Sequence, residues 1–281
     1  MVGSREMGRE QIESLDDYIR FCDELLRWVP KVSTKGDELL RKILVFYWVL
    51  NQPTIRRFQT PIIPKNANVD LSWLSRWMVR FAREQGQFLD TPQSATAIDT
   101  FYRNESYKES AHLWRSPIGG WKSFNHWFAR CWKDIDTARP LAAPGDPDII
   151  VSTADAVFQG IWPIIDGNVS FKLKGVKLDW PISTLLQTTD FSWSHGHFIH
   201  SFLAPSFYHR QHAPVSGTVI EAKIIQNQVF FQVEKREIGN IRRQALKPTL
   251  KPQTSQDTSG VKQEGLLSSR PKTTGKSQYY L

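Results

Sequence analysis

Hydrophobic periodicity changes once along this chain, near residue 148, and the change restricts the fold to helices followed by strands. From about residue 11 to 109, apolar residues recur at spacings of three and four, which is the pattern of amphipathic helices. From about residue 148 to 233, short β-branched and aromatic runs alternate with Gly, Pro, Asn and Asp, which is the pattern of strands and turns. A helical part followed by a strand-rich part predicts the α+β class.

Three helices are predicted in the first part of the chain. The first lies within residues 12–29, with Ser14 as its N-cap and Pro30 as its stop. The second covers residues 35–51, and the third begins at Asp70 or Ser72 and ends near Gly86. Aromatic residues follow these helices at helical spacing, so we interpret them as core side chains. They are Phe46, Tyr47, Trp48, Trp73, Trp77 and Phe81.

The strand-rich part is predicted to form five strands and one short helix. The strands fall within residues 148–153, 169–175, 195–204, 216–224 and 228–234, and the helix covers residues 181–187. After residue 234 the chain carries ten basic and three acidic residues, which account for most of the formal net charge of +8. Such a polar segment predicts a disordered tail. We therefore divide the chain into a helical domain (1–112), a strand-rich domain (113–241) and a tail (242–281).

The composition of the chain argues against several classes of protein. The two cysteines, Cys22 and Cys131, are too few for a disulfide scaffold and fit a reducing compartment. The longest apolar run covers residues 43–50, well short of a membrane-spanning helix, and the first residues lack the apolar core of a signal peptide. The basic residues are not interleaved with stacking aromatics, so we expect no nucleic-acid partner. These features together predict a cytoplasmic protein.

Histidines gather in one short stretch, and they are the candidates for chemistry. Five of the seven lie within eighteen positions: His195, His197, His200, His209 and His212. Strand alternation places the first two on one face and the third on the other. Three histidines and a water molecule would suit a hydrolytic zinc site. The stretch contains neither HExxH spacing nor a carboxylate, so proton transfer by histidine fits better, and a zinc hydrolase stays an alternative.

Four segments in a fixed order resemble one enzyme family. Residues 202–217 (FLAPSFYHRQHAPVSG) resemble the YHR-x-H-x-P-x-x-G signature of the pyruvoyl-dependent phosphatidylserine decarboxylases. Residues 121–141 (WKSFNHWFARCWKDIDTARPL), residues 150–156 (IVSTADA) and the stretch FKLKG followed by PISTLL resemble further blocks of that family. The helical region and the segment SHGHFIHSFL resemble a soluble branch that includes tryptophan decarboxylases of psilocybin-type pathways. The resemblance covers about residues 11 to 240.

The resemblance implies a carboxy-lyase that makes its own cofactor. In this family, a serine that follows glycine becomes a pyruvoyl group, which forms a Schiff base with the substrate amine and accepts electrons as carbon dioxide departs. By motif position, Asp155 would orient His212, the base for cofactor formation, and His209 would assist decarboxylation. The implied substrate is a tryptophan-like amino acid or phosphatidylserine, and no metal is implied.

The serine triplet of the family is missing from this sequence. The single Gly-Ser pair is Gly3–Ser4, and Ser259, Ser268 and Ser269 near the other end have no glycine before them. Residues 228–241 resemble a later strand of the family that follows the SGTV turn too closely. We therefore expect a C-terminally incomplete decarboxylase domain that forms no pyruvoyl group as it stands. A second chain carrying the missing strands is one expected partner. The alternative is a truncated, catalytically dead paralogue that acts as a binding protein.

Overall fold

The computed structural model describes residues 4–108, 110–146, 148–173, 176–189, 193–219, 221–222, 233–238 and 243–248. The helices are α1 (Arg5–Arg9), α2 (Leu15–Leu26), α3 (Glu38–Leu50), α4 (Pro53–Arg56), α5 (Trp73–Leu89), α6 (Asp99–Arg103), α7 (Glu105–Lys108), α8 (Phe124–Phe128), α9 (Ile135–Ala138) and α10 (Ile182–Leu186). Short 3-10 helices cover Pro64–Asn66 (η1), Pro92–Ala95 (η2) and Ala111–Leu113 (η3). The strands are β1 (Val157–Ile165), β2 (Asn168–Leu173), β3 (Val176–Pro181), β4 (His195–Phe202), β5 (Val233–Ile238) and β6 (Arg243–Pro248).

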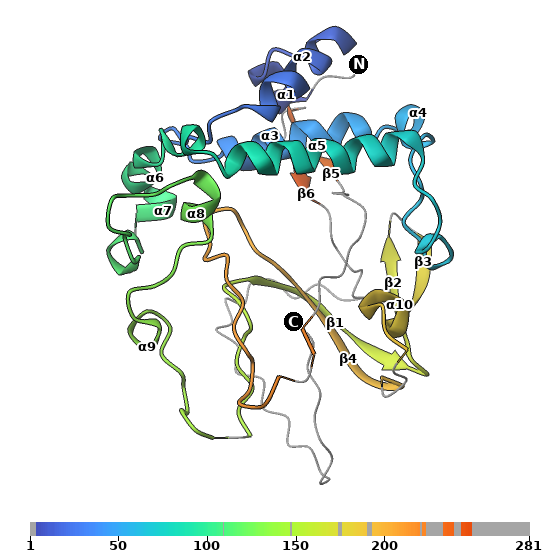
Figure 1. The fold of residues 1–281 in the computed structure, drawn as a ribbon. Coiled ribbons are helices and arrows are strands. Elements are labelled where there is room, and N and C mark those ends of the chain that lie inside the picture. Colours follow the sequence, from blue (N-terminus) through green and yellow to red (C-terminus); the bar gives the residue numbers. More distant parts are fainter. Residues whose placement is uncertain are drawn as a thin grey trace.

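Helices and an antiparallel sheet occupy different regions of the molecule, which confirms the predicted α+β class. Figure 1 shows α1–α5 along one side, the shorter helices α6–α9 beside them, and the sheet of β1–β4 below. Antiparallel pairing gives that sheet the order β3-β2-β1-β4. Among the described residues, no helix is both long enough and apolar enough to cross a membrane.

Helix α2 begins where its sequence predicts, because a capping box fixes its first turn. The Ser14 hydroxyl accepts the Asp17 N–H at 3.1 Å, and the Asp17 carboxylate accepts the Ser14 N–H at 2.9 Å. Together these bonds satisfy N–H groups that the helix itself leaves free. The helix ends at Leu26, before Pro30, as expected.

Helices α3 and α5 differ from prediction at one end each. Helix α3 begins at Glu38, three residues late, because Gly36 has φ +67°, a conformation that cannot continue a right-handed helix. Helix α5 has Ser72 as its N-cap, as predicted, but it passes through Gly86 and ends at Leu89. The predicted stop at Gly86 is therefore wrong. Buried Phe88 packs on the extra turn and offsets the modest cost of an interior glycine.

Two of the aromatic residues assigned to the core lie at the surface instead. Phe46 and Phe81 are buried and stacked at 4.6 Å between ring centroids, as expected. Trp73 and Trp77 are 60% and 37% exposed. Helical spacing shows that side chains share a face, but it does not show which face meets the core. The prediction was wrong for these two tryptophans.

The four-stranded sheet is organised around β1, which sequence patterning missed. A two-residue turn, Asp166–Gly167, has positive φ at both positions and joins β1 to β2. Strand β4 pairs with β1 along its whole length, with an irregularity between Phe158 and Gly160. The predicted strands at 169–175 and 195–204 correspond to β2 and β4, and the predicted helix corresponds to α10. In contrast, residues 148–153 and the described part of 216–224 form no strand.

Part of the predicted tail is structured. Strands β5 and β6 pair as an antiparallel hairpin, so residues 243–248 of the predicted tail form a strand. Leu246 is buried, and its N–H donates to the Glu6 carboxylate at 3.1 Å. A single well-buried leucine is easily missed within a basic stretch. Residues 228–232 and the serines at 259, 268 and 269 lie outside the described residues.

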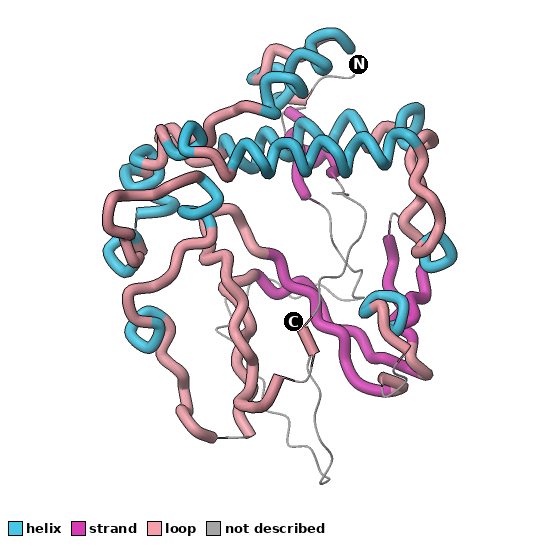
Figure 2. Tube along the Cα trace, in the orientation of Figure 1, coloured by secondary structure: helices cyan, strands magenta, loops and turns pink. Residues whose placement is uncertain are grey.

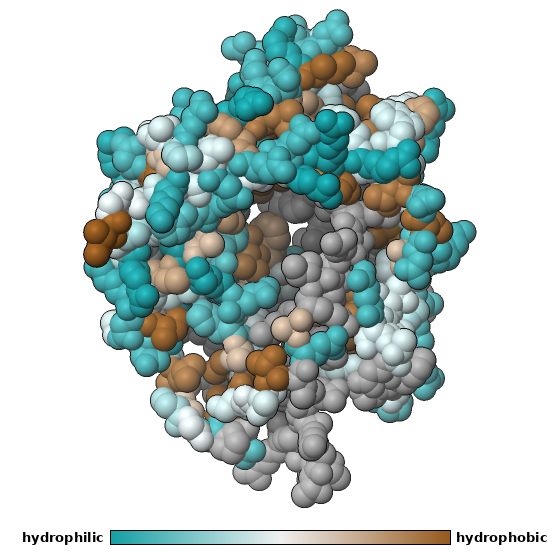
Figure 3. All heavy atoms as spheres, viewed as in Figure 1, coloured by the Kyte–Doolittle hydropathy of each residue, from teal (hydrophilic) through white to brown (hydrophobic). Residues whose placement is uncertain are grey.

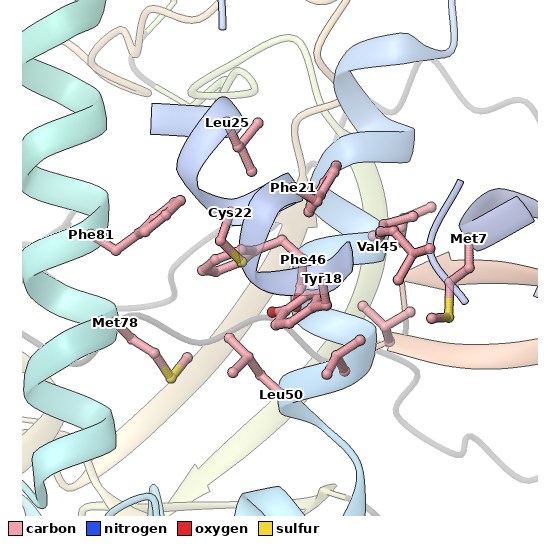
Figure 4. Close-up of a cluster of buried hydrophobic side chains, with 14 of the residues drawn as sticks. Met7, Tyr18, Phe21, Cys22, Leu25, Val45, Phe46, Leu50, Met78 and Phe81 are labelled. Carbon is pink, nitrogen blue, oxygen red and sulfur yellow. The ribbon is translucent and has the colours of Figure 1, made fainter. Parts of the chain in front are cut away.

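The core consists of three clusters. The first joins α1, α2, α3 and α5 to Val233 and Leu246 of the hairpin, and Figure 4 shows its buried side chains. The second runs from Val32 through the short helices to Tyr208, so it draws residues from both sides of the expected 112/113 boundary. The third lies under the sheet against α10. The division into domains therefore remains a prediction.

A buried ion-pair network ties α1 to α3. Glu10 accepts from the Arg41 guanidinium at 2.6 Å and from the Lys42 ammonium at 2.8 Å, and all three side chains are largely buried. Burial alone would raise the pKa of Glu10, but the bonds from Lys42 and Arg41 outweigh it and lower that pKa. The network supports the packing of the first helix on the third.

We expect Glu10→Gln to lower the free energy of unfolding by about 3 kcal/mol, since it removes the negative charge that two largely buried cations share, while Arg41 keeps its bond to Asp37. Urea unfolding followed by circular dichroism measures the loss. The matched control is Glu84→Gln, which removes an exposed pair with Arg80 and should cost less than about 1 kcal/mol. Equal losses in the two variants would contradict a structural role for the buried network.

Candidate active site

Two loops carry the predicted site residues and pair with each other. The Val151 N–H donates to the Pro214 carbonyl at 3.0 Å, and the His212 N–H donates to the Thr153 carbonyl at 2.7 Å. Figure 2 shows both segments as loops next to the sheet. This pairing places Asp155 and His212 on neighbouring segments. Their catalytic roles remain predictions.

A buried arginine anchors the loop after β4 that carries Tyr208, His209 and His212, which we call the histidine loop. Arg130 is 1% exposed, and its Nη2 donates to the Phe207 carbonyl at 3.0 Å and more weakly to the Ser206 carbonyl at 3.4 Å. Its guanidinium carbon lies 4.4 Å from the ring centre of Trp114 and 4.8 Å from that of Trp127. Burial lowers the pKa of Arg130 to about 10, which still leaves it charged at neutral pH. The charge therefore holds two backbone carbonyls just before Tyr208.

His209 packs beside the Arg130 contacts, and its imidazole is held in the neutral form. Its ring stacks on Phe128 with 3.9 Å between centroids, and its Nε2 is 3.0 Å from the Ala204 carbonyl. A carbonyl only accepts, so Nε2 carries the proton and Nδ1 is left as the acceptor. Burial lowers the pKa of His209, and the nearby charge of Arg130 adds to that effect. A neutral imidazole with an acceptor nitrogen is suited to proton transfer.

Asp155 is paired with a cation rather than with a histidine. The Arg139 guanidinium donates through Nε at 2.7 Å to one oxygen of Asp155 and through Nη2 to the other. This hydrogen bonding raises the pKa of Arg139. Among the described hydrogen bonds, none joins Asp155 to His212. The expected orienting bond between them is therefore not formed in this structure.

An aromatic column connects Arg139 to His212. The Arg139 guanidinium carbon lies 4.6 Å from the ring centre of Trp132, which stacks on Tyr208 at 4.7 Å. Tyr208 in turn lies nearly parallel to the exposed His212 ring, with 5.6 Å between centroids. Asp155 and His212 are thus linked through stacked rings rather than by a direct bond. Arg210, on the same loop, donates to the Ala129 carbonyl at 2.8 Å and anchors the turn.

The three histidines of β4 do not join this site. The β1–β4 register pairs His195 with Ile165, His197 with Pro163 and His200 with Gly160, so the predicted face alternation is present. His195 and His197 are exposed, whereas burial lowers the pKa of His200. Within the described residues, no three His, Cys, Asp or Glu side chains come together to hold a metal ion. The zinc-hydrolase alternative therefore gains no support from the geometry.

Sequence analysis gave no role to the residues that organise this site. Arg130, Arg139, Phe128 and Trp132 all fall within the FNHWFARCW…ARP stretch that was noted for its resemblance. The available signal was the interleaving of arginines with aromatics in one short segment, which favours cation–π contacts. That pattern does not indicate which loop the arginines would hold.

We expect Arg130→Met to lower the free energy of unfolding by about 3 kcal/mol, since it removes the donor to the part-buried Ser206 and Phe207 carbonyls and the cation that packs on two buried tryptophans. Hydrogen exchange of the His209 and Arg210 amides should speed up in the same variant. Arg210→Met is the matched control, because that exposed side chain makes one contact and should cost less than about 1 kcal/mol. Unchanged exchange in Arg130→Met would mean that the loop does not depend on Arg130.

Comparison with known proteins finds decarboxylases similar to this chain. The chain is 29% identical over 168 residues to phosphatidylserine decarboxylase proenzyme 3 of Schizosaccharomyces pombe, covering 59% of this chain and 17% of that protein. It is 30% identical over 165 residues to the phosphatidylserine decarboxylase proenzyme of Brevibacillus brevis, covering 58% and 55%. It is also 27% identical over 119 residues to the L-tryptophan decarboxylase of Psilocybe cyanescens, covering 41% and 27%.

The chain thus spans roughly half or less of the length of each of these relatives. Residues 124–249 match the phosphatidylserine decarboxylase family, and that stretch includes α8, the Arg130 contacts, Asp155 and the histidine loop. Over this region the chain is similar to the phosphatidylserine decarboxylase family.

Proposed function

We propose that this chain provides the histidine half of a decarboxylase site, which removes the carboxylate of an amine-bearing acid. The observation that carries the proposal is the neutral His209, fixed between Phe128 and the Arg130-anchored loop. In the reaction, the bond from the α-carbon to the carboxylate breaks, carbon dioxide leaves, and a proton takes its place on that carbon. His209 relays this proton: its Nδ1 accepts a proton from solvent and passes it to the carbon, which returns the ring to its neutral form. The substrate is either a tryptophan-like amino acid or phosphatidylserine, the classes named for the relatives.

The electron-accepting group of this family is a pyruvoyl ketone, and the residues of this chain do not fit its formation. Ser4, the single serine that follows a glycine, is buried at the start of α1. Its hydroxyl accepts the Met7 N–H at 3.2 Å, and Met7 belongs to the helical core rather than to the cluster that contains Tyr208. A working site therefore takes its pyruvoyl-forming serine from residues outside this sequence, such as a second chain.

A second function is favoured by the lack of a suitable serine, and the Arg139–Asp155 pair is compatible with it. The carboxylate that would orient His212 is occupied by Arg139, and the sequence offers no suitable serine. Both facts fit a catalytically inactive relative that keeps the binding half of the site. Such a protein would bind the amino acid or the phospholipid without releasing carbon dioxide.

Carbon dioxide release from purified full-length chain, with L-tryptophan or phosphatidylserine as substrate, separates the two functions. The chain supplies no pyruvoyl-forming serine, so we expect release only after a pyruvoyl-bearing polypeptide of the family is added, with a loss of at least about 100-fold in His209→Gln because the group that relays the proton is removed. His195→Gln, an exposed histidine on β4, should keep the wild-type rate. Intact mass after borohydride treatment reports a pyruvoyl group independently. Absence of release after that addition would refute the decarboxylase and favour the binding protein, whereas release by the chain alone would refute the need for an outside serine.

The buried histidines also predict how stability depends on pH. The folded-state pKa values of His209 and His200 lie below the ordinary 6.5, so the unfolded chain binds more protons near that pH. Stability should therefore fall as the pH falls below about 6.5, and His209→Gln should flatten that decline. Urea unfolding from neutral pH to about pH 5 measures the slope, with His195→Gln as control. A slope unchanged in His209→Gln would show that its ring is not held in the neutral form.

A further inference from the structure

Exposed aromatic side chains gather where the loop after α4 meets the start of α5. Trp73, Trp77 and Phe58 are 60%, 37% and 42% exposed, and the Phe58 and Trp73 rings lie 6.1 Å apart. Val69, on the intervening loop, is also exposed. Isolated surface aromatics are common, but adjacent ones on two elements mark an interaction surface.

Basic side chains are interleaved with these aromatics. Along α5, Trp73, Arg76, Trp77 and Arg80 follow an i, i+3, i+4, i+7 spacing, which places them on one exposed face. The Arg57 guanidinium lies 4.8 Å from the ring centre of Phe58. Six basic and two acidic residues fall within residues 53–84: Arg56, Arg57, Lys65, Arg76, Arg80 and Arg83 against Asp70 and Glu84. Figure 3 shows pale and brown side chains among teal ones at the end of the molecule that carries α4.

We propose that this surface, the α4–α5 patch (Arg57, Phe58, Val69, Trp73, Arg76 and Trp77), docks the chain on an anionic lipid bilayer. Tryptophan and phenylalanine rings settle at the boundary between headgroups and acyl chains. Arginines extend their apolar stems along that boundary and keep the charge at the phosphates. The excess of positive charge makes the patch complementary to an anionic surface rather than to a zwitterionic one.

The patch is separate from the decarboxylase site. It lies within residues 57–77, outside the segment at 124–249 that matches the family, and none of its residues contributes to the histidine loop. The docking proposal therefore does not rest on the proposed reaction. Docking of this kind needs no spanning helix.

Co-sedimentation of the full 281-residue chain with lipid vesicles tests the proposal. We expect binding to phosphatidylcholine vesicles that contain phosphatidylglycerol, little binding to phosphatidylcholine alone, and weakening by added salt. Phosphatidylglycerol has no amine or carboxylate to lose, so its binding is independent of decarboxylation. A catalytically inactive chain that still binds would leave the docking proposal standing while the proposed reaction fails.

Two double variants locate the binding surface. Arg57→Gln with Arg76→Gln should lower the vesicle partition coefficient about 30-fold through the loss of two surface charges. Phe58→Gln with Trp73→Gln should weaken binding by removing the rings that enter the interface. Arg115→Gln with Lys122→Gln removes two exposed charges elsewhere and should bind to within a few-fold of wild type, as expected for charges away from the membrane. Thermal unfolding confirms that each variant stays folded.

Three results would overturn the proposal. The first is patch variants that bind as well as wild type, because the basic residues after 234 would then account for the attraction. The second is the absence of binding to any vesicle. The third is displacement of the chain from vesicles by a low concentration of polyglutamate, with the displacement lost in the patch variants. That result would identify an acidic polypeptide as the partner.

Discussion

A buried guanidinium without a carboxylate partner holds the candidate site together. Arg130 packs on two tryptophan rings and donates to three backbone carbonyls, those of Phe128, Ser206 and Phe207, and its Nε has no partner among the described residues. Burying an unpaired cation is costly, and the depressed pKa of Arg130 reflects that cost. The ring faces and the carbonyl dipoles offset it only while both stay in place. The contacts that offset the cost of burying the Arg130 charge therefore also fix the position of the histidine loop.

The chemistry of the loop follows from that constraint. Arg130 holds residues 206 and 207 in place. In that position of the loop, His209 stacks on Phe128 and its Nε2 faces the Ala204 carbonyl. The positive charge that anchors the loop also disfavours a second positive charge on the imidazole. Position and protonation state are thus set by one residue, Arg130. A lysine there would keep the charge but lose the planar fork that spans two carbonyls.

Local patterns predicted the elements that depend on local chemistry. The Ser14 N-cap, the stop before Pro30, β4 and α10 were predicted correctly because their signals lie within one turn or one strand. Strand β1 was missed because Gly160 and Pro163 interrupt its pattern, although pairing with β4 supports both. Trp73 and Arg130 show the deeper limit. Spacing cannot tell which helical face is buried, and charged residues are rarely buried, so an exposed tryptophan and a buried arginine both run against the usual expectation.

The position of Asp155 bears on whether the site is active or inactive, but it does not decide the matter. Its partner Arg139 is 43% exposed, and a pair so open to water is worth about 1 kcal/mol or less. The backbone bond between His212 and Thr153 already holds the two segments side by side. Exchanging Arg139 for His212 therefore needs side-chain rotation rather than a change of fold. The ion pair is compatible with both functions, and the source of the electron-accepting group is what separates a decarboxylase from a protein that only binds.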